Sequence, residues 1–261
     1  MIKIFDTHAH YDDDAFANDQ ASLIESLPAH GVLKVTNVGA NLQTSVNSID
    51  LAQKYDYIYA AVGVHPSDTD ELENLDGEAE IYKLAKSSDK VVAIGEIGLD
   101  YHYEDTDKAL QQKWFAKQIE ISKELNLPMI IHSRDAARDT VDIMNKYDAG
   151  KTGGVVHCFS YTKELAEIFL KMGFFIGIGG VVTFKNSKKL KEALEVIPLD
   201  KIVLETDAPY LAPDPYRGKR NSSIYIPYVV SAIAEIKHVS EDEIYETTWS
   251  NAHRLYGLQD V

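Results

Sequence analysis

The sequence predicts an α/β fold, a (β/α)8 TIM barrel, in a single domain that spans residues 1–261. Three observations support this fold class. Short runs rich in apolar and β-branched residues alternate with stretches of helical period, and no linker rich in Pro, Gly or Ser divides them. At 261 residues and 45% hydrophobic content, the chain is long enough to bury one large core. Strands that alternate with helices close most economically into a parallel barrel.

Eight runs are expected to be strands. They lie at Lys3 to Ala9, Leu33 to Gly39, Ile58 to Val64, Val91 to Ile97, Met129 to His132, Gly154 to Cys158, Phe174 to Ile178 and Ile202 to Glu205. An open doubly wound sheet is the alternative. Its dinucleotide signature is missing, because the glycine-rich run GFFIGIGG at 173–180 has the pattern of a strand and a bend and does not open a helix.

Helical periodicity fills much of the sequence between these strands. The expected helices include Ala21 to His30, Leu42 to Tyr55, Asp107 to Asn126, Asp135 to Lys146, Lys163 to Met172 and Ser187 to Val196. Ser133 and Ser160 precede two of these segments and are expected to be N-caps, because a serine hydroxyl accepts a hydrogen bond from the first free backbone amides.

The composition argues against several functional classes. A formal net charge of −15 argues against a broad basic surface for nucleic acid, so a polyanionic substrate is expected to be held locally. No apolar stretch approaches the roughly 20 residues of a membrane span, and MIKIFD lacks the features of a signal peptide, which predicts a cytoplasmic protein with no membrane partner. The single cysteine, Cys158, is given no role, and no obligatory protein partner is indicated.

Two histidines near the start of the chain, His8 and His10, give the first indication of chemistry. Residues i and i+2 of a strand point to the same face, so both imidazoles are expected to aim at one place, as a metal ion requires. An isolated pair would also fit two solvated histidines. Four more residues of metal-ligand type fall at the ends of later predicted strands and favour the metal site: Glu96, His132, His157 and Asp207.

All six residues are expected at the C-terminal ends of strands, where barrels of this class carry their active sites. Four imidazoles and two carboxylates exceed the three protein ligands of one catalytic zinc, so two divalent ions are predicted. Glu96 is expected to bridge them, and Asp207 to bind one ion and take the proton of the attacking water; these two are the predicted catalytic residues. Nitrogen and oxygen ligands suit zinc, manganese, magnesium, cobalt or nickel, so the identity of the metal stays open.

Six motifs follow one another along the chain. They are FDTHAH at 5–10, GVHP at 63–66, IGEIGLDYH at 94–102, IHSRDA at 131–136, HCFS at 157–160 and LETDAPYLAP at 204–213. In these motifs the chain resembles, over nearly its whole length, the TatD-related metal-dependent hydrolases, or TatD deoxyribonucleases, of the amidohydrolase-like superfamily. The resemblance implies a first metal on His8, His10 and Asp207. It implies a second on His132 and His157, with Glu96 as the bridge.

The same resemblance implies that His65, in GVHP, faces the substrate; its alternative role is to orient the loop through Pro66. One departure follows the last strand, where RGKRNSS stands in place of the common RGKRNEP, so Ser222 and Ser223 replace Glu-Pro. The metal set is untouched by this change. Glu205 lies two residues before Asp207 and is expected to support the ligands from behind, rather than to bind a third ion.

The function predicted from the sequence is two-metal hydrolysis of phosphodiester bonds, in DNA or another phosphodiester, by a metal-bridged hydroxide. Arg134, Arg217 and Arg220 are expected to contact phosphates at the barrel mouth, and Asn221 to contact the substrate beside them. One alternative is a metal-dependent ester or amide hydrolase, such as an aminoacyl-tRNA deacylase. Glu96, in the place where many amide-cleaving relatives carry a carboxylated lysine, favours the nuclease. A non-catalytic binding barrel is the other alternative, and it predicts loss of ligand residues that are all present.

Overall fold

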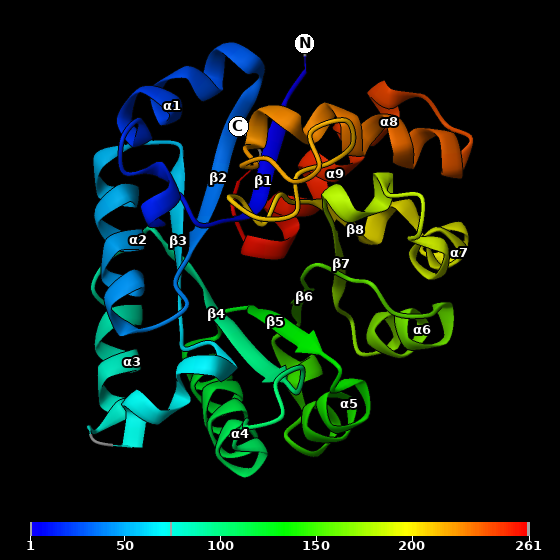
Figure 1. Ribbon diagram of the computed structural model, residues 1–261. Helices are drawn as coiled ribbons and strands as arrows, with labels where there is room; N and C mark the ends of the chain where they lie inside the picture. Colours follow the sequence, from blue (N-terminus) through cyan, green and yellow to red (C-terminus); the bar gives the residue numbers. More distant parts are fainter. Residues whose placement is uncertain (1, 74, 260–261) are drawn as a thin grey trace.

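Eight parallel strands form one barrel in the computed structural model, which describes residues 2–73 and 75–259 (Figure 1). The strands follow one another around the barrel in chain order: β1 (Ile4–Ala9), β2 (Val32–Val38), β3 (Ile58–Val62), β4 (Val91–Asp100), β5 (Met129–Arg134), β6 (Gly154–Val156), β7 (Phe175–Ile178) and β8 (Ile202–Leu204). The predicted (β/α)8 barrel is therefore confirmed, and all eight predicted strands are present within three residues of their expected ends.

The barrel closes where the end of β1 meets the segment after β8. Ala9 and Ala208 form a parallel bridge. The backbone amide of Asp207 donates to the carbonyl of His8 at 2.9 Å, and the amide of His10 donates to the carbonyl of Ala208 at 2.7 Å. Closure of the barrel thus joins the backbones of three predicted metal ligands.

The helices surround the barrel (Figure 1). They are α1 (Gln20–Ser26), α2 (Leu42–Lys54), α3 (Gly77–Ala85), α4 (Lys108–Leu125), α5 (Ala137–Lys146), α6 (Lys163–Lys171), α7 (Lys188–Val196), α8 (Ile226–Lys237) and α9 (Glu241–Tyr256). The segment predicted as one helix from Ala21 to His30 is α-helical only to Ser26, and a 3-10 turn at Leu27–His30 completes it. Within the described ranges, no helix is both long and apolar enough to cross a membrane.

The two predicted N-caps are wrong. Ala136 and Thr162 occupy the N-cap positions of α5 and α6. Strand β5 continues to Arg134, so Ser133 lies inside the strand and cannot cap the helix that follows. The sequence pattern identified the apolar run of β5 correctly, but it did not show that the polar residues Ser133 and Arg134 extend the strand.

Apolar side chains fill the barrel below the predicted metal ligands. One buried cluster combines strand residues with residues of α9: Phe5, Ala61, Ala93, Ile130, Val155, Val203, Trp249, Ala252 and Tyr256. Phe5, Ala93 and Ile130 precede His8, Glu96 and His132 on the same strands. Helix α9 contacts β1, β6 and β8. The Tyr256 hydroxyl donates to the carbonyl of Thr7 at 2.7 Å. Helix α9 therefore covers the N-terminal end of the barrel, and the C-terminal end remains for the site.

A β-bulge in β1 changes which residues face the barrel interior. Between the pairs Asp6–Val35 and Ala9–Asn37, three steps along β1 match two steps along β2. An extra residue of this kind shifts the in-and-out alternation of the strand by one. Phe5 belongs to the interior cluster before the bulge, and His8 faces the interior after it.

A second bulge in β4 does the same for Glu96. The partners of Ile94 and Ile97 on β5 are Met129 and Ile131, so three steps again match two. Ile94 and Ile97 both pack in the core between the strands and the helices, although their separation of three residues would put them on opposite faces of a regular strand. The bulge leaves Glu96 between them free to face the interior.

Gly98 is required where β4 passes β5. Its φ is +146°, and a Cβ there would lie 1.9 Å from the carbonyl oxygen of His132. We expect Gly98→Ala to reduce the free energy of unfolding by about 3–5 kcal/mol, the sum of backbone strain and overpacking. Gly173 also has a positive φ, +92°, but its Cβ would have no neighbour within 4 Å. Gly173→Ala is therefore the matched control and should cost about 1–2 kcal/mol. Equal losses in urea unfolding of the two variants would contradict a steric requirement at Gly98.

Candidate metal centre

A cavity of about 420 Å³ opens at the C-terminal end of the barrel. Its lining residues come from most of the strand ends: His10, Asp12, Asp13, Ala40, Thr44, His65, Ser67, Glu96, Asp100, Tyr103, His132, Arg134, His157, Asp207 and Tyr210. His8 lies fully buried directly behind them. The structure thus brings together all six residues predicted as metal ligands.

The first group of ligand atoms surrounds one oxygen of Glu96. The Nε2 atoms of His8 and His10 are 3.0 Å apart. Glu96 Oε2 lies 3.5 Å from the first of these nitrogens and 3.8 Å from the second, and Asp207 Oδ1 lies 3.7 and 3.4 Å from them. His10 Nδ1 contacts the carbonyl of Val38 at 2.8 Å, which places the ring proton on Nδ1 and leaves Nε2 as a free donor atom for a metal.

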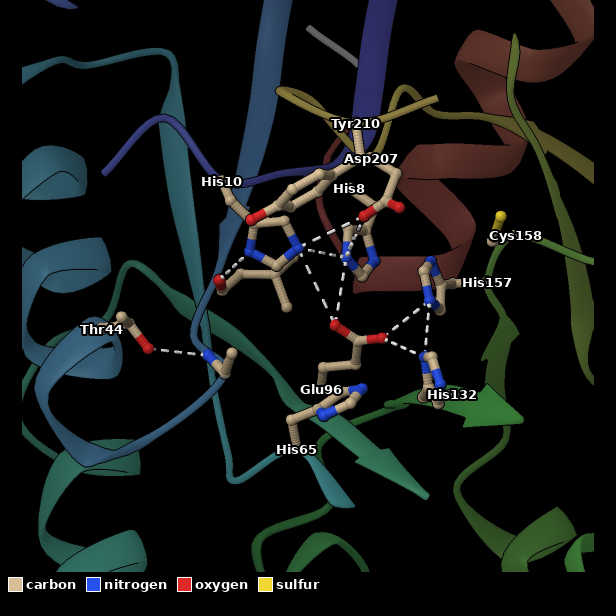
Figure 2. Close-up of polar contacts among 12 residues, drawn as sticks. His8, His10, Thr44, His65, Glu96, His132, His157, Cys158, Asp207 and Tyr210 are labelled. Atoms are coloured by element: carbon tan, nitrogen blue, oxygen red, sulfur yellow. Dashed lines mark hydrogen bonds and ion pairs between the residues drawn. The ribbon is translucent and has the colours of Figure 1, made fainter. Parts of the chain in front are cut away.

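The second group surrounds the other oxygen of the same carboxylate. Glu96 Oε1 lies 2.8 Å from His132 Nδ1 and 2.7 Å from His157 Nε2. These two nitrogens are 3.3 Å apart. Figure 2 shows Glu96 between the two groups, with one oxygen turned to each.

Both groups fit a divalent transition metal. Tetrahedral coordination at about 2.1 Å places ligand atoms about 3.4 Å apart. The first group has separations of 3.0 to 3.8 Å and the second of 2.7 to 3.3 Å. Two imidazole nitrogens at 3.0 Å, such as those of His8 and His10, need a shared proton or a cation between them. Each group therefore has ligand atoms spaced so that they could hold a divalent ion, and Glu96 contributes one oxygen to each group.

The surroundings of Glu96 favour the ionised carboxylate that a metal ligand requires. Burial raises the pKa of its carboxyl, but the charges of His157 and His8 and hydrogen bonds from His132 and His157 outweigh it and hold that pKa well below its usual range. Burial also opposes the ionisation of Asp207, and the hydrogen bond from His10 more than compensates, so its pKa is lowered. Both carboxylates are ionised at neutral pH, as metal binding requires.

Asp100 belongs to the site although it was not predicted from the sequence. Its side chain is 5% exposed, and its Oδ2 lies 3.4 Å from His132 Nε2. The Oδ1 atom accepts a hydrogen bond from the amide of His102 at 2.9 Å. A carboxylate at Nε2 keeps the ring proton there and frees Nδ1 of His132 for a metal. The signal was present in the sequence, because Asp100 ends the same β4 run that carries Glu96.

His65, Asp100 and His132 form a third group whose potential ligand atoms all lie within 4.8 Å of one another. This group shares His132 with the second metal group. One imidazole binds two ions only after losing both ring protons, so the carboxylate of Asp100 is better explained as the acceptor that orients His132.

His65 lies in the cavity with its ring 4.3 Å from that of His132. Burial and the neighbouring His132 lower its pKa to about 3, so it is neutral at neutral pH. Its Nδ1 accepts a hydrogen bond from the amide of Ser67 at 3.1 Å, which places the ring proton on Nε2. This bond orients the loop after Pro66 and also leaves an N–H for a ligand in the cavity, so both roles considered for His65 remain predictions.

Of the predicted substrate-binding arginines, Arg134 lies at the cavity, 4.0 Å from Asp100 Oδ2, with a side chain that is 48% exposed. Arg220 instead binds Asp19 through two hydrogen bonds of 2.7 and 2.6 Å. The guanidinium of Arg217 lies 4.2 Å from the ring centroid of Phe184. Neither Arg217 nor Arg220 is among the described residues that line the cavity, because their side chains contact Phe184, after β7, and Asp19, just before α1.

Asn221, which was predicted to contact the substrate, is buried and hydrogen-bonded within the protein. It is 1% exposed, and its amide nitrogen donates to the carbonyls of Thr206 and Tyr210, both at 2.8 Å. Its carbonyl oxygen accepts from the amide of Ser222 at 2.8 Å. With all these polar atoms used, Asn221 fixes the loop that carries Asp207.

Ser222 and Ser223, which stand in place of Glu-Pro, are buried in the same region. The Ser223 hydroxyl donates to Asp6 Oδ2 at 2.6 Å and contacts the hydroxyl of Tyr11 at 2.7 Å. Asp6 also accepts from the hydroxyl of Thr206 at 2.7 Å. These bonds connect β1 to the segment that contains Asp207. The loop is therefore hydrogen-bonded to the barrel even though Ser-Ser replaces Glu-Pro at 222 and 223.

Glu205 lies behind the second metal group. It is fully buried, accepts from the amide of Cys158 at 2.5 Å, and has Oε1 3.8 Å from His157 Nδ1. Burial raises the pKa of Glu205 to about 8. Burial also raises the pKa of the Cys158 thiol well above its usual range, which makes this cysteine a poor nucleophile.

A (β/α)8 barrel with these histidines and carboxylates at its C-terminal end has the arrangement of a metal-dependent enzyme site. Comparison with known proteins gives the family. The TatD related DNase family matches residues 5–257, so the chain belongs to the TatD family of metal-dependent hydrolases.

Similar proteins agree with this assignment. The metal-dependent hydrolase YabD of Bacillus subtilis is 42% identical over 98% of this chain and 99% of its own length. The metal-dependent hydrolase YcfH of Escherichia coli is 35% identical over 98% of this chain and 96% of its own. The crystal structure of the TatD homologue YjjV from E. coli has a TM-score of 0.91 at 30% identity and covers 98% of both chains.

We expect Asp100→Asn to weaken binding at the second metal group by about 10- to 100-fold and to leave the first group nearly unchanged. An asparagine that keeps its oxygen on the amide of His102 turns its NH2 toward His132 Nε2, which favours the ring tautomer that cannot bind metal through Nδ1. Calorimetric titration of metal-free protein with Mn²⁺ or Zn²⁺ measures both sites.

Asp139→Asn is the control, because Asp139 accepts hydrogen bonds from Tyr101 and Gln112, both at 2.9 Å, and lies outside the cavity lining. Equal weakening of both ions by Asp100→Asn would show a general loss of structure, and two unchanged affinities would remove Asp100 from the site.

Proposed function

We propose that this protein hydrolyses phosphodiester bonds in DNA with the help of two divalent metal ions. The observation that carries the proposal is the position of Glu96, whose two carboxylate oxygens face two separate groups of nitrogen and oxygen ligands. Ions held by these groups would supply Lewis-acid activation of water and of the phosphoryl oxygens. The description of the family as a DNase supports DNA as the substrate.

The charge of the cavity supports a role for metal in substrate binding. Its lining carries five carboxylates, from Asp12, Asp13, Glu96, Asp100 and Asp207, and the single guanidinium of Arg134. A phosphodiester anion is repelled by this surface. The raised pKa values of His10 and His157, about 9 and about 10, offset part of this negative charge while no metal is bound. Two divalent ions would make the centre more positive, so we expect metal binding to strengthen the binding of the phosphate.

Three side chains have roles of their own in this scheme. Asp207 Oδ1 faces the His8 and His10 pair, which leaves its other oxygen to accept the proton of the attacking water. His65 is neutral and presents its Nε2–H to a non-bridging phosphate oxygen. Arg134 at the rim adds a charge-assisted hydrogen bond to the substrate.

The direct test measures cleavage of end-labelled single-stranded and double-stranded DNA by metal-reconstituted and metal-free protein. Glu96→Ala and Asp207→Asn should each reduce kcat by at least about 10³-fold, because they remove the bridge and the proton acceptor. Circular dichroism melting of each variant separates loss of activity from loss of fold. If the reconstituted protein leaves DNA intact but hydrolyses carboxylic esters or aminoacyl-tRNA, the ester hydrolase replaces the nuclease.

A second prediction concerns the basic residues. Arg134→Ala should raise KM for DNA about 5- to 20-fold, consistent with the loss of one hydrogen bond to a charged group. Arg220→Ala should leave KM within about twofold, because the Arg220 guanidinium is engaged by Asp19 away from the cavity. Steady-state kinetics at constant ionic strength measures both. The opposite ranking would return Arg220 to the substrate site.

A further inference from the structure

Two tyrosines lie exposed at the rim of the metal cavity. Tyr103 is 58% exposed and Tyr210 is 54% exposed. Within the part of the chain that the structure describes, these two are the exposed large apolar side chains that line this cavity. The predicted metal ligands are buried or only partly exposed, so the cavity has polar walls and two exposed aromatic side chains.

The two rings stand on opposite sides of the opening. Tyr103 follows β4, and Tyr210 follows β8. In a barrel of eight strands arranged in chain order, β4 and β8 are half a turn apart. The ligands on β1, β4 and β5 and just after β1, β6 and β8 surround the space between, and both rings line the same cavity.

Contacts hold each ring in place without covering it. The Tyr210 hydroxyl donates to Asp13 Oδ2 at 2.8 Å, and its ring centroid is 6.4 Å from that of His10, above which it lies in Figure 2. Tyr103 has its ring centroid 5.1 Å from that of His102 and 6.0 Å from the guanidinium of Arg134. Rings positioned in this way lose little conformational entropy when a flat group stacks on them.

Stability of the fold does not explain these positions. Neither tyrosine belongs to the described hydrophobic clusters, and more than half of each side chain is in contact with solvent. Tyrosine is enriched at binding interfaces, where its ring contacts the partner and its hydroxyl stays hydrogen-bonded. Stacking on tyrosine is available to every nucleobase, because each base has a π face.

We propose that Tyr103 and Tyr210 are the stacking sites for the two nucleobases on either side of the cleaved phosphodiester. The proposal rests on the proposed function, since it requires the phosphate at the metal centre. It deepens that function by assigning the substrate's bases, rather than its phosphates alone, to named residues. Recognition of this kind accepts any base and compensates for the small number of cations at the rim.

The test uses five-residue DNA strands and the metal-reconstituted enzyme. One strand is all thymidine; two others carry a tetrahydrofuran residue, which lacks a base, on the 5′ or the 3′ side of the cleaved bond. We expect Tyr103→Ala and Tyr210→Ala each to raise KM for the thymidine strand about tenfold, and the Phe variants to stay within about threefold of wild type. For each tyrosine, the increase in KM caused by the Ala variant should be smaller on the one strand that lacks the base stacked on that tyrosine. A double-mutant cycle between the side chain and the base measures this difference.

Tyr228→Ala is the control, because Tyr228 is 40% exposed but packs with Tyr216 and Tyr225 and does not line the cavity. Tyr228→Ala should leave KM unchanged on all three strands. Losses at Tyr103 and Tyr210 that are equal on all three strands would overturn the stacking sites while the nuclease stands. The same holds if the Phe variants lose as much as the Ala variants, since the hydroxyl would then be responsible. If wild-type enzyme cleaves none of the strands, the proposed function fails and the stacking sites fail with it.

Discussion

The buried carboxylate of Glu96 is the constraint on which the site depends. An ionised carboxylate that is 4% exposed is costly unless compensating charges and hydrogen bonds surround it. Here four imidazoles do so, and they come from two strands, β1 and β5, and from the segments directly after β1 and β6. The histidines form two pairs, His8 with His10 and His132 with His157, whose facing ring nitrogens are 3.0 and 3.3 Å apart. Such close pairs of nitrogens are stable only with the carboxylate, or a cation, beside them. The barrel, its closure and its ligands therefore form one interdependent arrangement.

The β-bulges explain how regular strands deliver this arrangement. An unbroken alternation in β1 and β4 would continue from Phe5 and Ala93 to Thr7 and Gly95, and His8 and Glu96 would face the helices. One extra residue in each strand reverses the alternation just before the ligand. Below the bulges the interior is apolar and covered by α9, and above them it is polar and open to the cavity. The apolar core and the candidate metal site therefore lie one above the other along the barrel axis.

The proposed nuclease activity is compatible with an acidic protein because metal ions would concentrate positive charge at one site. The chain has a formal net charge of −15, and the cavity itself is acidic. Metal ions would reverse the sign of the potential at the site alone, while the rest of the surface repels nucleic acid. Arg134 and the exposed tyrosines at the rim fit this scheme, since stacking adds affinity without adding charge. Arginines farther along the loop after β8 are used for structure, as the pairing of Arg220 with Asp19 shows.

The sequence by itself determined the fold class, the eight strands and the six candidate ligands, because strand periodicity and residue type are local properties. His8 and His10 were expected to converge, and they do, although the bulge that turns them inward has no local signature in FDTHAH. Only the tertiary structure placed Asp100 beside His132, turned Asn221 into the buried anchor of the Asp207 loop, and paired Arg220 with Asp19. These outcomes depend on which loops meet in space. Contacts between residues distant in the chain are decided by packing, which the order of residues along one strand does not contain.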